Sequence, residues 1–322
     1  MSGIKIRGTG RFAPAKIVTN DDLAKIVDTN DEWITTRTGI KTRHHCTTET
    51  HTDMCVNAAR QALENAGISP EDIGACVVAT FSSDYLSPSA ACMVQRGLGL
   101  PYDAVCFDLN AACSGFLFAI HTMECLLAQA PRKYGLVIGA EMLSRFINWE
   151  DRGTCVLFGD GAGAAVLKAE ETGIIDMMMG ADGTKGDVLA CTSRTVGNFL
   201  TGTKPELGFM TMDGQEVFKF AVRKVPESVM ELLQRTGTKK EDIKYYVLHQ
   251  ANERIIEAAA RRLKEPMEKF PMTIGQFGNT STASIPLLLN DMIQKNMLKR
   301  GDKIIMSGFG AGMTWGAVLM EW

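Results

Sequence analysis

The sequence predicts an α/β protein built from two copies of one strand-and-helix unit, and two observations carry that prediction. The segments Gly67–Ile73 and Gly237–Ile243 share a glycine, a Glu-Asp pair and an isoleucine at the same spacing, and each leads into an apolar run typical of a buried strand. The runs Tyr134–Gly139 and Lys303–Gly308 are each followed later by a glycine-rich apolar segment. Because the order is the same in both halves, we expect one unit over residues 1–172 and a second over residues 173–322.

Hydrophobic periodicity places the elements of both units. Continuous apolar runs predict buried strands, and apolar residues three or four apart predict helices. In the first half, strands are expected at Ile4–Thr9, Ala75–Thr80, Ala104–Phe107, Tyr134–Gly139 and Gly161–Leu167, and helices at Thr52–Ala66, Ser87–Gly97 and from Phe116 onward. The polar stretch Lys185–Pro205 is expected to be an irregular surface excursion. In the second half, strands are expected at Tyr245–Leu248, Lys303–Gly308 and Gly310–Leu319, and helices at Val217–Leu233, Glu253–Leu263 and Ile285–Asn296.

The overall composition excludes several classes of protein. The net charge of −3 supplies no basic field for nucleic acid, and no apolar run approaches the length of a membrane span, so we expect neither partner. The nine cysteines show no Cys-x-x-Cys spacing, which argues against a disulfide framework and favours a reducing, cytoplasmic location. The histidines and cysteines between His44 and Cys55 fit no zinc pattern, so no metal site is predicted.

One cysteine lies at the turn between a predicted strand and a predicted helix. Cys113 follows Asp108–Ala112, and the apolar helical spacing begins at Phe116. A helix N-terminus offers free N–H groups and a partial positive charge, which are expected to lower the pKa of a thiol there towards neutrality. Cys113 is therefore a candidate nucleophile, although a buried, inert cysteine is the commoner alternative.

The repeat adds two partners to this cysteine. In the sequence register, Cys113 corresponds to Asn279, which precedes the helix predicted at Ile285–Asn296. His249 lies at the end of the strand predicted at Tyr245–Leu248. Polar residues at strand and helix ends that converge on one centre are typical of an active site.

Three positively charged regions are candidate ligand contacts. Trp33 and Arg37 are four residues apart and share a helical face, where they could stack on a planar base; a Trp in the core and a solvated Arg is the alternative. The glycine-rich segment from Asp151 to Gly163 lacks the Lys-Ser/Thr of a phosphate loop, so only Arg152 is a candidate contact there. Several other basic residues could receive an acidic partner or form a solvated face: Lys219, Arg254, Arg261 and Arg262.

Six motifs, in order along the whole chain, resemble those of the β-ketoacyl-[acyl-carrier-protein] synthase III family. They are Asp31–Ile40, Ala111–Phe116, Phe158–Ala164, His249–Asn252, Gly278–Ser281 and Gly308–Gly312. The resemblance implies a thiolase-like fold in which two pseudo-symmetric α/β halves form a layered αβαβα core. It also implies a homodimer.

The resemblance assigns roles to individual residues. The implied catalytic triad is Cys113, His249 and Asn279, with backbone N–H groups of Cys113 and Ala311 as the oxyanion hole. The implied coenzyme A and acyl tunnel contacts are Trp33, Arg37, Arg152, Gly214, Phe218, Ala251 and Asn252. The implied carrier-protein contacts are Gln250, Ala251, Asn252, Glu253, Arg254, Lys219, Arg261 and Arg262. Many relatives have glycine at the position of Ala311, so its backbone is expected to accept a methyl group.

The implied reaction joins an acyl-CoA primer, expected to be acetyl-CoA, to malonyl-[acyl-carrier-protein] with loss of CO2, which initiates fatty acid synthesis. Coenzyme A thioester is a substrate, and no cofactor is expected. Cys113 would carry the acyl group, and neutral His249 and Asn279 would donate hydrogen bonds to the enolate.

Missing residues exclude neighbouring families. The second half has a single histidine, there is no cysteine after Cys191, and no glutamate lies between Thr80 and Cys113. These absences argue against elongating synthases, biosynthetic thiolases and hydroxymethylglutaryl-CoA synthases, respectively. The alternatives that remain are a Cys-His-Asn condensing enzyme of polyketide or quinolone type, a papain-type hydrolase and a non-catalytic binding module.

Overall fold

The computed structural model describes residues 3–322, and its strands form two large sheets. The first sheet has the order β1-β7-β6-β4-β5 and the second the order β11-β12-β13-β8. The first comprises β1 (Gly3–Phe12), β4 (Ile73–Ala79), β5 (Val105–Leu109), β6 (Tyr134–Glu141) and β7 (Gly161–Glu170). The second comprises β8 (Ile174–Ala181), β11 (Ile243–Leu248), β12 (Lys303–Gly310) and β13 (Thr314–Glu321).

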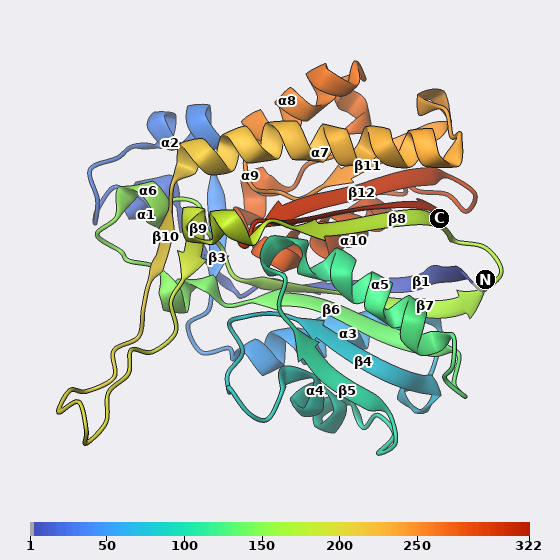
Figure 1. Cartoon of the computed structure of the whole chain (residues 1–322), viewed down its shortest axis with the longest axis horizontal. Helices are drawn as coiled ribbons and strands as arrows, with labels where there is room; N and C mark the ends of the chain where they lie inside the picture. The colour runs from blue at the N-terminus through green and yellow to red at the C-terminus, as the bar shows by residue number, and fades with distance from the viewer. Residues whose placement is uncertain (1–2) are drawn as a thin grey trace.

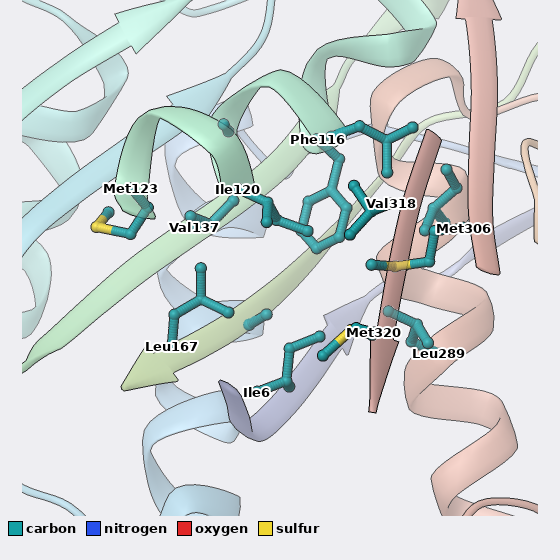
Figure 2. Packing of buried hydrophobic residues seen from close by; sticks show 14 of the residues in the cluster. Ile6, Phe116, Ile120, Met123, Val137, Leu167, Leu289, Met306, Val318 and Met320 are labelled. Atoms are coloured by element: carbon teal, nitrogen blue, oxygen red, sulfur yellow. The ribbon is translucent and has the colours of Figure 1, made fainter. Parts of the chain in front are cut away.

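The helices divide these sheets into five layers (Figure 1). One outer layer is α3 (His51–Ala66) with α4 (Ala90–Leu98), the middle layer is α5 (Gly115–Leu127) with α10 (Ser284–Gln294), and the other outer layer is α7 (Gly214–Thr236) with α8 (Glu253–Leu263). The middle helices pack against both sheets, and Figure 2 shows Phe116 and Ile120 of α5 facing Val318 and Met320 of β13. The predicted α/β class and five-layered core are confirmed.

Smaller elements surround this core. The remaining strands and helices are β2 (Lys16–Thr19), β3 (Thr42–His45), β9 (Leu189–Cys191), β10 (Met210–Met212), α1 (Asn20–Leu23), α2 (Asp31–Thr38), α6 (Arg152–Cys155) and α9 (Ile274–Phe277). The predicted surface excursion is only partly irregular, because β9 pairs with β10 to form the base of a long hairpin that extends from the body in Figure 1. No helix among residues 3–322 combines the length and apolar character needed to cross a membrane.

The backbone repeats in both halves. Helix α3 ends at Gly67 with φ +67°, and α7 ends at Gly237 with φ +66°. Each glycine is followed by a short 3₁₀ turn and then by a buried parallel strand, β4 or β11. The boundary predicted at residue 172 falls in the connection between β7 and β8. As a limit between two domains it stays a prediction.

The sequence register that paired Cys113 with Asn279 is wrong by three residues. The 3₁₀ turns η2 (Ala112–Ser114) and η7 (Ser281–Ala283) begin with Ala112 at φ +46° and Ser281 at φ +51°. In both turns an asparagine Oδ1, of Asn110 or Asn279, accepts the N–H of that residue, at 3.1 and 2.9 Å. Asn279 therefore corresponds to Asn110, and Cys113 corresponds to a threonine. The sequence alone does not reveal this register because the turn depends on a side-chain cap and a positive φ.

Candidate active site

Cys113 is held in the turn that joins β5 to α5. Its side chain is buried, and the backbone of β12 passes directly against it. A Cβ on Gly310 would lie 2.5 Å from the backbone nitrogen of Cys113, so only glycine allows this close approach. The two halves of the molecule therefore meet at the predicted nucleophile.

The predicted lowering of the Cys113 pKa is wrong. Burial raises the pKa of the thiol to about 12, and the nearby Ser281 side chain offsets only part of that effect. The reason is that Cys113 is 8% exposed, so the loss of water around the thiolate outweighs the partial charge of the turn and helix. Cys113 is a neutral thiol at rest.

His249 is also neutral. Its side chain is buried, and this burial lowers the pKa of the imidazole to about 3. Its Nδ1 lies 2.7 Å from the Oγ of Ser284, which already accepts the N–H of Gln250 at 3.3 Å. Ser284 Oγ has no other hydrogen-bond acceptor among residues 3–322, so its hydrogen points to Nδ1 and the ring carries its own proton on Nε2.

Asn279 is fixed by a loop of the first half. Its N–H donates to the carbonyl of Leu157, and its carbonyl accepts the N–H of Gly159, at 2.9 and 3.0 Å. Since its Oδ1 caps the Ser281 turn, its Nδ2 remains the available donor. A Cβ on Gly159 would lie 2.3 Å from the carbonyl oxygen of Phe277, which accords with the prediction of close packing rather than phosphate binding for this loop.

Together, these contacts gather the three predicted residues around η7. Cys113 contacts Ser281, Asn279 precedes the turn, and His249 contacts Ser284 after it. The sequence interpretation missed both serines, although each lies in the segment that follows Gly278. Among residues 3–322, no three His, Cys, Asp or Glu side chains gather as a metal site requires.

Trp33, Arg37 and Arg152 form a cluster on the surface. The guanidinium carbons of Arg37 and Arg152 lie 4.7 and 4.8 Å from the centre of the Trp33 ring. Arg152 is oriented by the carbonyl of Asp28, at 2.9 Å, and pairs with the exposed carboxylate of the same residue, at 3.8 Å. The cluster presents two positive charges beside an aromatic face, which suits an anionic ligand with a planar base.

This cluster is joined to the segment after His249. Asn252 caps α8 through the N–H of Arg254, at 2.9 Å, and its Nδ2 donates to the carbonyl of Arg37, at 3.0 Å. Glu253 packs against Gly39, where a Cβ would lie 2.2 Å from its carboxylate. Ala251 is half-buried between His249 and this cap. The predicted coenzyme A and carrier-protein contacts therefore adjoin.

One predicted carrier contact is wrong. The Gln250 side chain is buried, and its amide bonds the carbonyl of Leu248 and the N–H groups of Thr273 and Ile274. It braces the loop and is not available to a partner. The other predicted basic contacts are exposed, but Lys219 pairs with Glu216 and Arg261 with Glu257, as in a solvated face. Two of these four basic contacts, Arg254 and Arg262, are exposed and have no such ion pair among residues 3–322.

The remaining predicted residues lie at the start of α7 and at the end of β12. Gly214 is exposed at the start of α7, and Phe218 is half-buried one turn further along. Ala311 follows Gly310 at the end of β12, and its φ is not positive. The expectation that its backbone accepts a methyl group is therefore met.

Comparison with known proteins gives the family. Models of 3-oxoacyl-[acyl-carrier-protein] synthase III and of its C-terminal region match residues 107–183 and 233–322. The β-ketoacyl-[acyl-carrier-protein] synthase III of Clostridium acetobutylicum is 48% identical over 100% of this chain and 99% of its own. The chain belongs to the 3-oxoacyl-[acyl-carrier-protein] synthase III family. The two names describe the same condensing acyltransferases.

Solved structures of synthase III proteins agree in fold. The synthase III of Aquifex aeolicus has a TM-score of 0.92 and 44% identity, covering 99% of this chain and 100% of its own. The priming β-ketosynthase of the R1128 polyketide pathway has a TM-score of 0.91 but 32% identity, covering 99% and 96%. The fold is thiolase-like, and the identities favour the fatty acid synthases over the polyketide relative.

Proposed function

We propose that the chain condenses an acyl-CoA primer, in the simplest case acetyl-CoA, with malonyl-[acyl-carrier-protein]. The products are 3-oxoacyl-[acyl-carrier-protein], coenzyme A and CO2, and the reaction initiates fatty acid synthesis in the cytoplasm. The observation that carries the proposal is the convergence of Cys113, His249 and Asn279 on the single turn η7.

In the first half-reaction, the sulfur of Cys113 attacks the acyl-CoA thioester. Backbone N–H groups of Cys113 and Ala311 serve the oxyanion, and each such donor contributes about 3–4 kcal/mol in comparable sites. The Trp33–Arg37–Arg152 cluster binds the nucleotide end, and Gly214, Phe218 and Ala251 line the path to the thiol. Coenzyme A leaves, and Cys113 keeps the acyl group as a thioester.

In the second half-reaction, loss of CO2 from the malonyl group creates the carbanion, so no strong base is needed. Two donors must stabilise the thioester oxygen as it becomes an enolate oxygen. The Nε2–H of His249 and the amide of Asn279 meet this need because both are neutral donors. A papain-type hydrolase needs a thiolate–imidazolium pair, and the pKa directions of Cys113 and His249 oppose one.

The carrier protein is proposed to meet the start of α8. Asn252, Glu253 and Arg254 adjoin the coenzyme A cluster, and Arg262 extends the basic surface along α8. Exposed arginines there would match an acidic carrier protein in charge. Lys219 and Arg261 add less positive charge to this surface because each is paired with a glutamate.

A homodimer is part of the proposal. Strand β5 is the edge of the first sheet, and its Val105 is half exposed. An unpaired edge strand with apolar residues favours pairing with a second copy. Sedimentation should give a dimer, and Val105→Lys should shift it towards monomer; a monomeric wild-type protein would contradict this part.

The whole proposal is tested with radiolabelled acetyl-CoA and malonyl-[acyl-carrier-protein]. We expect label on Cys113 before malonyl-carrier protein is added, and CO2 release afterwards. A protein that neither takes up label nor releases CO2 is not this enzyme. Longer or branched acyl-CoA competitors identify the primer.

A further inference from the structure

One buried acidic side chain, that of Glu141, has no role in the scheme above. Glu141 ends β6, and its side chain is fully buried. Its Oε2 accepts hydrogen bonds from Thr80, Ser82 and the N–H of Phe81. Its Oε1 is buried and has no hydrogen-bond partner among residues 3–322. Such an atom in a native fold calls for a functional explanation.

Strand geometry directs Glu141 towards η7. Alternate residues of a strand share a face, so Val137, Gly139 and Glu141 all face the middle layer. A Cβ on Gly139 would lie 2.5 Å from the carbonyl oxygen of Thr282. Gly161, which pairs with Glu141, would place a Cβ 3.7 Å from the side chain of Thr280. Glu141 therefore lies on the face of β6 that packs against η7, the turn that also contacts η2 and its Cys113.

The turn η7 contacts both β6, which carries the acid, and η2, which carries the thiol. The Ser281 side chain lowers the pKa of the Cys113 thiol against the larger effect of burial. The hydroxyl oxygens of Thr280, Ser281 and Thr282 are buried and have no hydrogen-bond partner among residues 3–322. A hydroxyl can accept one proton while it donates another, so the hydroxyl of Ser281, the residue of this turn that acts on the thiol, can pass a proton from sulfur to carboxylate.

The chemistry requires a place for the Cys113 proton. The thiol must lose it to attack the acyl-CoA, yet buried His249, with a pKa of about 3, is a poor acceptor. Burial raises the pKa of Glu141 to about 8, although its hydrogen bonds act in the opposite direction. Glu141 is therefore much closer to the thiol in basicity and to the pH at which enzymes work.

We propose that Glu141 stores the Cys113 proton while Cys113 carries the acyl group, and that the hydroxyl of Ser281 relays it. During loading, the S–H bond breaks, sulfur bonds the acyl carbon, and a proton reaches Oε1 of Glu141. Coenzyme A leaves as a thiolate and takes a proton from solvent. During condensation, the enolate carbon displaces Cys113 as a thiolate, and Glu141 returns the stored proton to it. Protons and electrons balance over both half-reactions, and the inference rests on the proposed function.

Other titratable groups surround Glu141 but do not duplicate this role. Burial raises the pKa of the Cys55 and Cys191 thiols, and the charge of Glu141 adds to this effect. His51 bonds Thr80 and the carbonyl of Ala140, and burial lowers its pKa. Asp84 and Arg145 form an ion pair, and both residues act on His51. None of these groups contacts the Cys113 thiol.

The test compares wild type with Glu141→Gln, which keeps size and hydrogen bonding but cannot store a proton. Acetyl loading of Cys113 is followed by rapid quench across the pH range in which Glu141 titrates. The wild-type rate should rise with pH and level off, whereas the variant should load about 100-fold more slowly and show no levelling at that pH.

Decarboxylation of malonyl-carrier protein provides the control because it needs no thiol proton. It is measured in a Cys113→Ala background, with and without the Glu141→Gln substitution. The two proteins should release CO2 at the same rate. A slower release from the protein that carries Glu141→Gln would show general damage to the site instead of a lost proton store, and would overturn the proposal.

A matched pair of variants tests the relay. Ser281→Ala removes the relay hydroxyl, and alanine fits because Ala112 adopts the same positive φ in the first half. Thr282→Val removes a neighbouring unpaired hydroxyl and should load at the wild-type rate. Wild-type loading by Glu141→Gln or Ser281→Ala overturns the proposal, and so does an equal loss of loading and decarboxylation. If wild type itself does not load acetyl groups, the proposed function fails instead.

Discussion

The two halves of the molecule contain the same turn but use it differently. Asn110 and Asn279 each cap the N–H two residues later, and the next helix begins at Gly115 or Ser284. The third residue after the cap is Cys113 in the first half and Thr282 in the second. The asparagine is exposed in the first half and buried in the second. The same backbone turn therefore presents the predicted nucleophile, Cys113, in the first half and a predicted hydrogen-bond donor, Asn279, in the second.

The difference shows how a duplicated fold divides a two-step reaction. In the proposed scheme, the first half supplies the thiol and the cluster around Trp33 that binds coenzyme A. The second half supplies the donors His249 and Asn279 and the exposed start of α8. Acyl transfer and decarboxylation should therefore respond separately to changes in the two turns.

The largest effect on activity is expected at the third residue after the capping asparagine. Cys113→Ala should abolish acetyl loading and condensation because no other thiol lies in the turn. Thr282→Val, at the matching position, should retain both activities. Loading is measured by retained label and condensation by product formation; loss in the threonine variant alone would reverse the assignment of the halves.

The next effect is expected at the capping asparagines. Asn279→Asp keeps the oxygen that caps Ser281 but loses the donor, so CO2 release should fall about 100-fold or more while acetyl loading persists. His249→Ala should do the same. Asn110→Asp should change neither rate. Undiminished CO2 release from both second-half variants would mean that the enolate donors lie elsewhere.

Two glycines test the supports of the turns. A Cβ at Gly310 would meet the nitrogen of Cys113 at 2.5 Å, and one at Gly139 would meet the oxygen of Thr282 at 2.5 Å. Each alanine variant should lose about 1–3 kcal/mol in free energy of unfolding. Acetyl loading should be impaired more by Gly310→Ala, since it displaces the nucleophile. Chemical denaturation and loading rates of the two proteins provide the comparison.

Substitutions in the two halves of the molecule should also affect the binding of different substrates. Trp33→Ala should raise the KM for acetyl-CoA about tenfold, the effect of losing one stacked base, and leave acetyl-pantetheine unaffected. Arg254→Glu should raise the KM for malonyl-carrier protein and leave acetyl-CoA loading unchanged. The measurement is steady-state kinetics with each substrate varied in turn. An equal rise in the KM for acetyl-CoA and for malonyl-carrier protein in either variant would contradict the division of binding between the two halves.

The smallest effect is a dependence of stability on pH. The unfolded carboxyl of Glu141 has the ordinary pKa of 4.5, whereas burial raises it to about 8 in the folded protein. Between these values the folded state binds more protons, so stability falls as pH rises, by about 1 kcal/mol per pH unit near neutrality. Glu141→Gln should flatten this slope in denaturation curves. His249, with its lowered pKa, acts in the opposite direction and only below its ordinary value of 6.5.

The sequence predicted features that depend on local pattern. The helix at Glu253–Leu263 has the predicted bounds, and the glycine ends at Gly67 and Gly237 follow from capping preferences. Features that depend on three-dimensional burial were mispredicted or missed. The pKa of Cys113 is set by packing from both halves, and the Gln250 amide is bound by a loop more than twenty residues away. Glu141 lies beyond the strand predicted at Tyr134–Gly139 and received no role, because its burial depends on packing.

The most direct test of the division between the halves is a paired measurement on Asn279→Asp. The protein is incubated with acetyl-CoA, the peptide that contains Cys113 is analysed by mass spectrometry, and CO2 is measured after malonyl-carrier protein is added. We predict a fully acetylated Cys113 with CO2 release about 100-fold or more below wild type. An unacetylated Cys113, or CO2 release at the wild-type rate, would contradict the account.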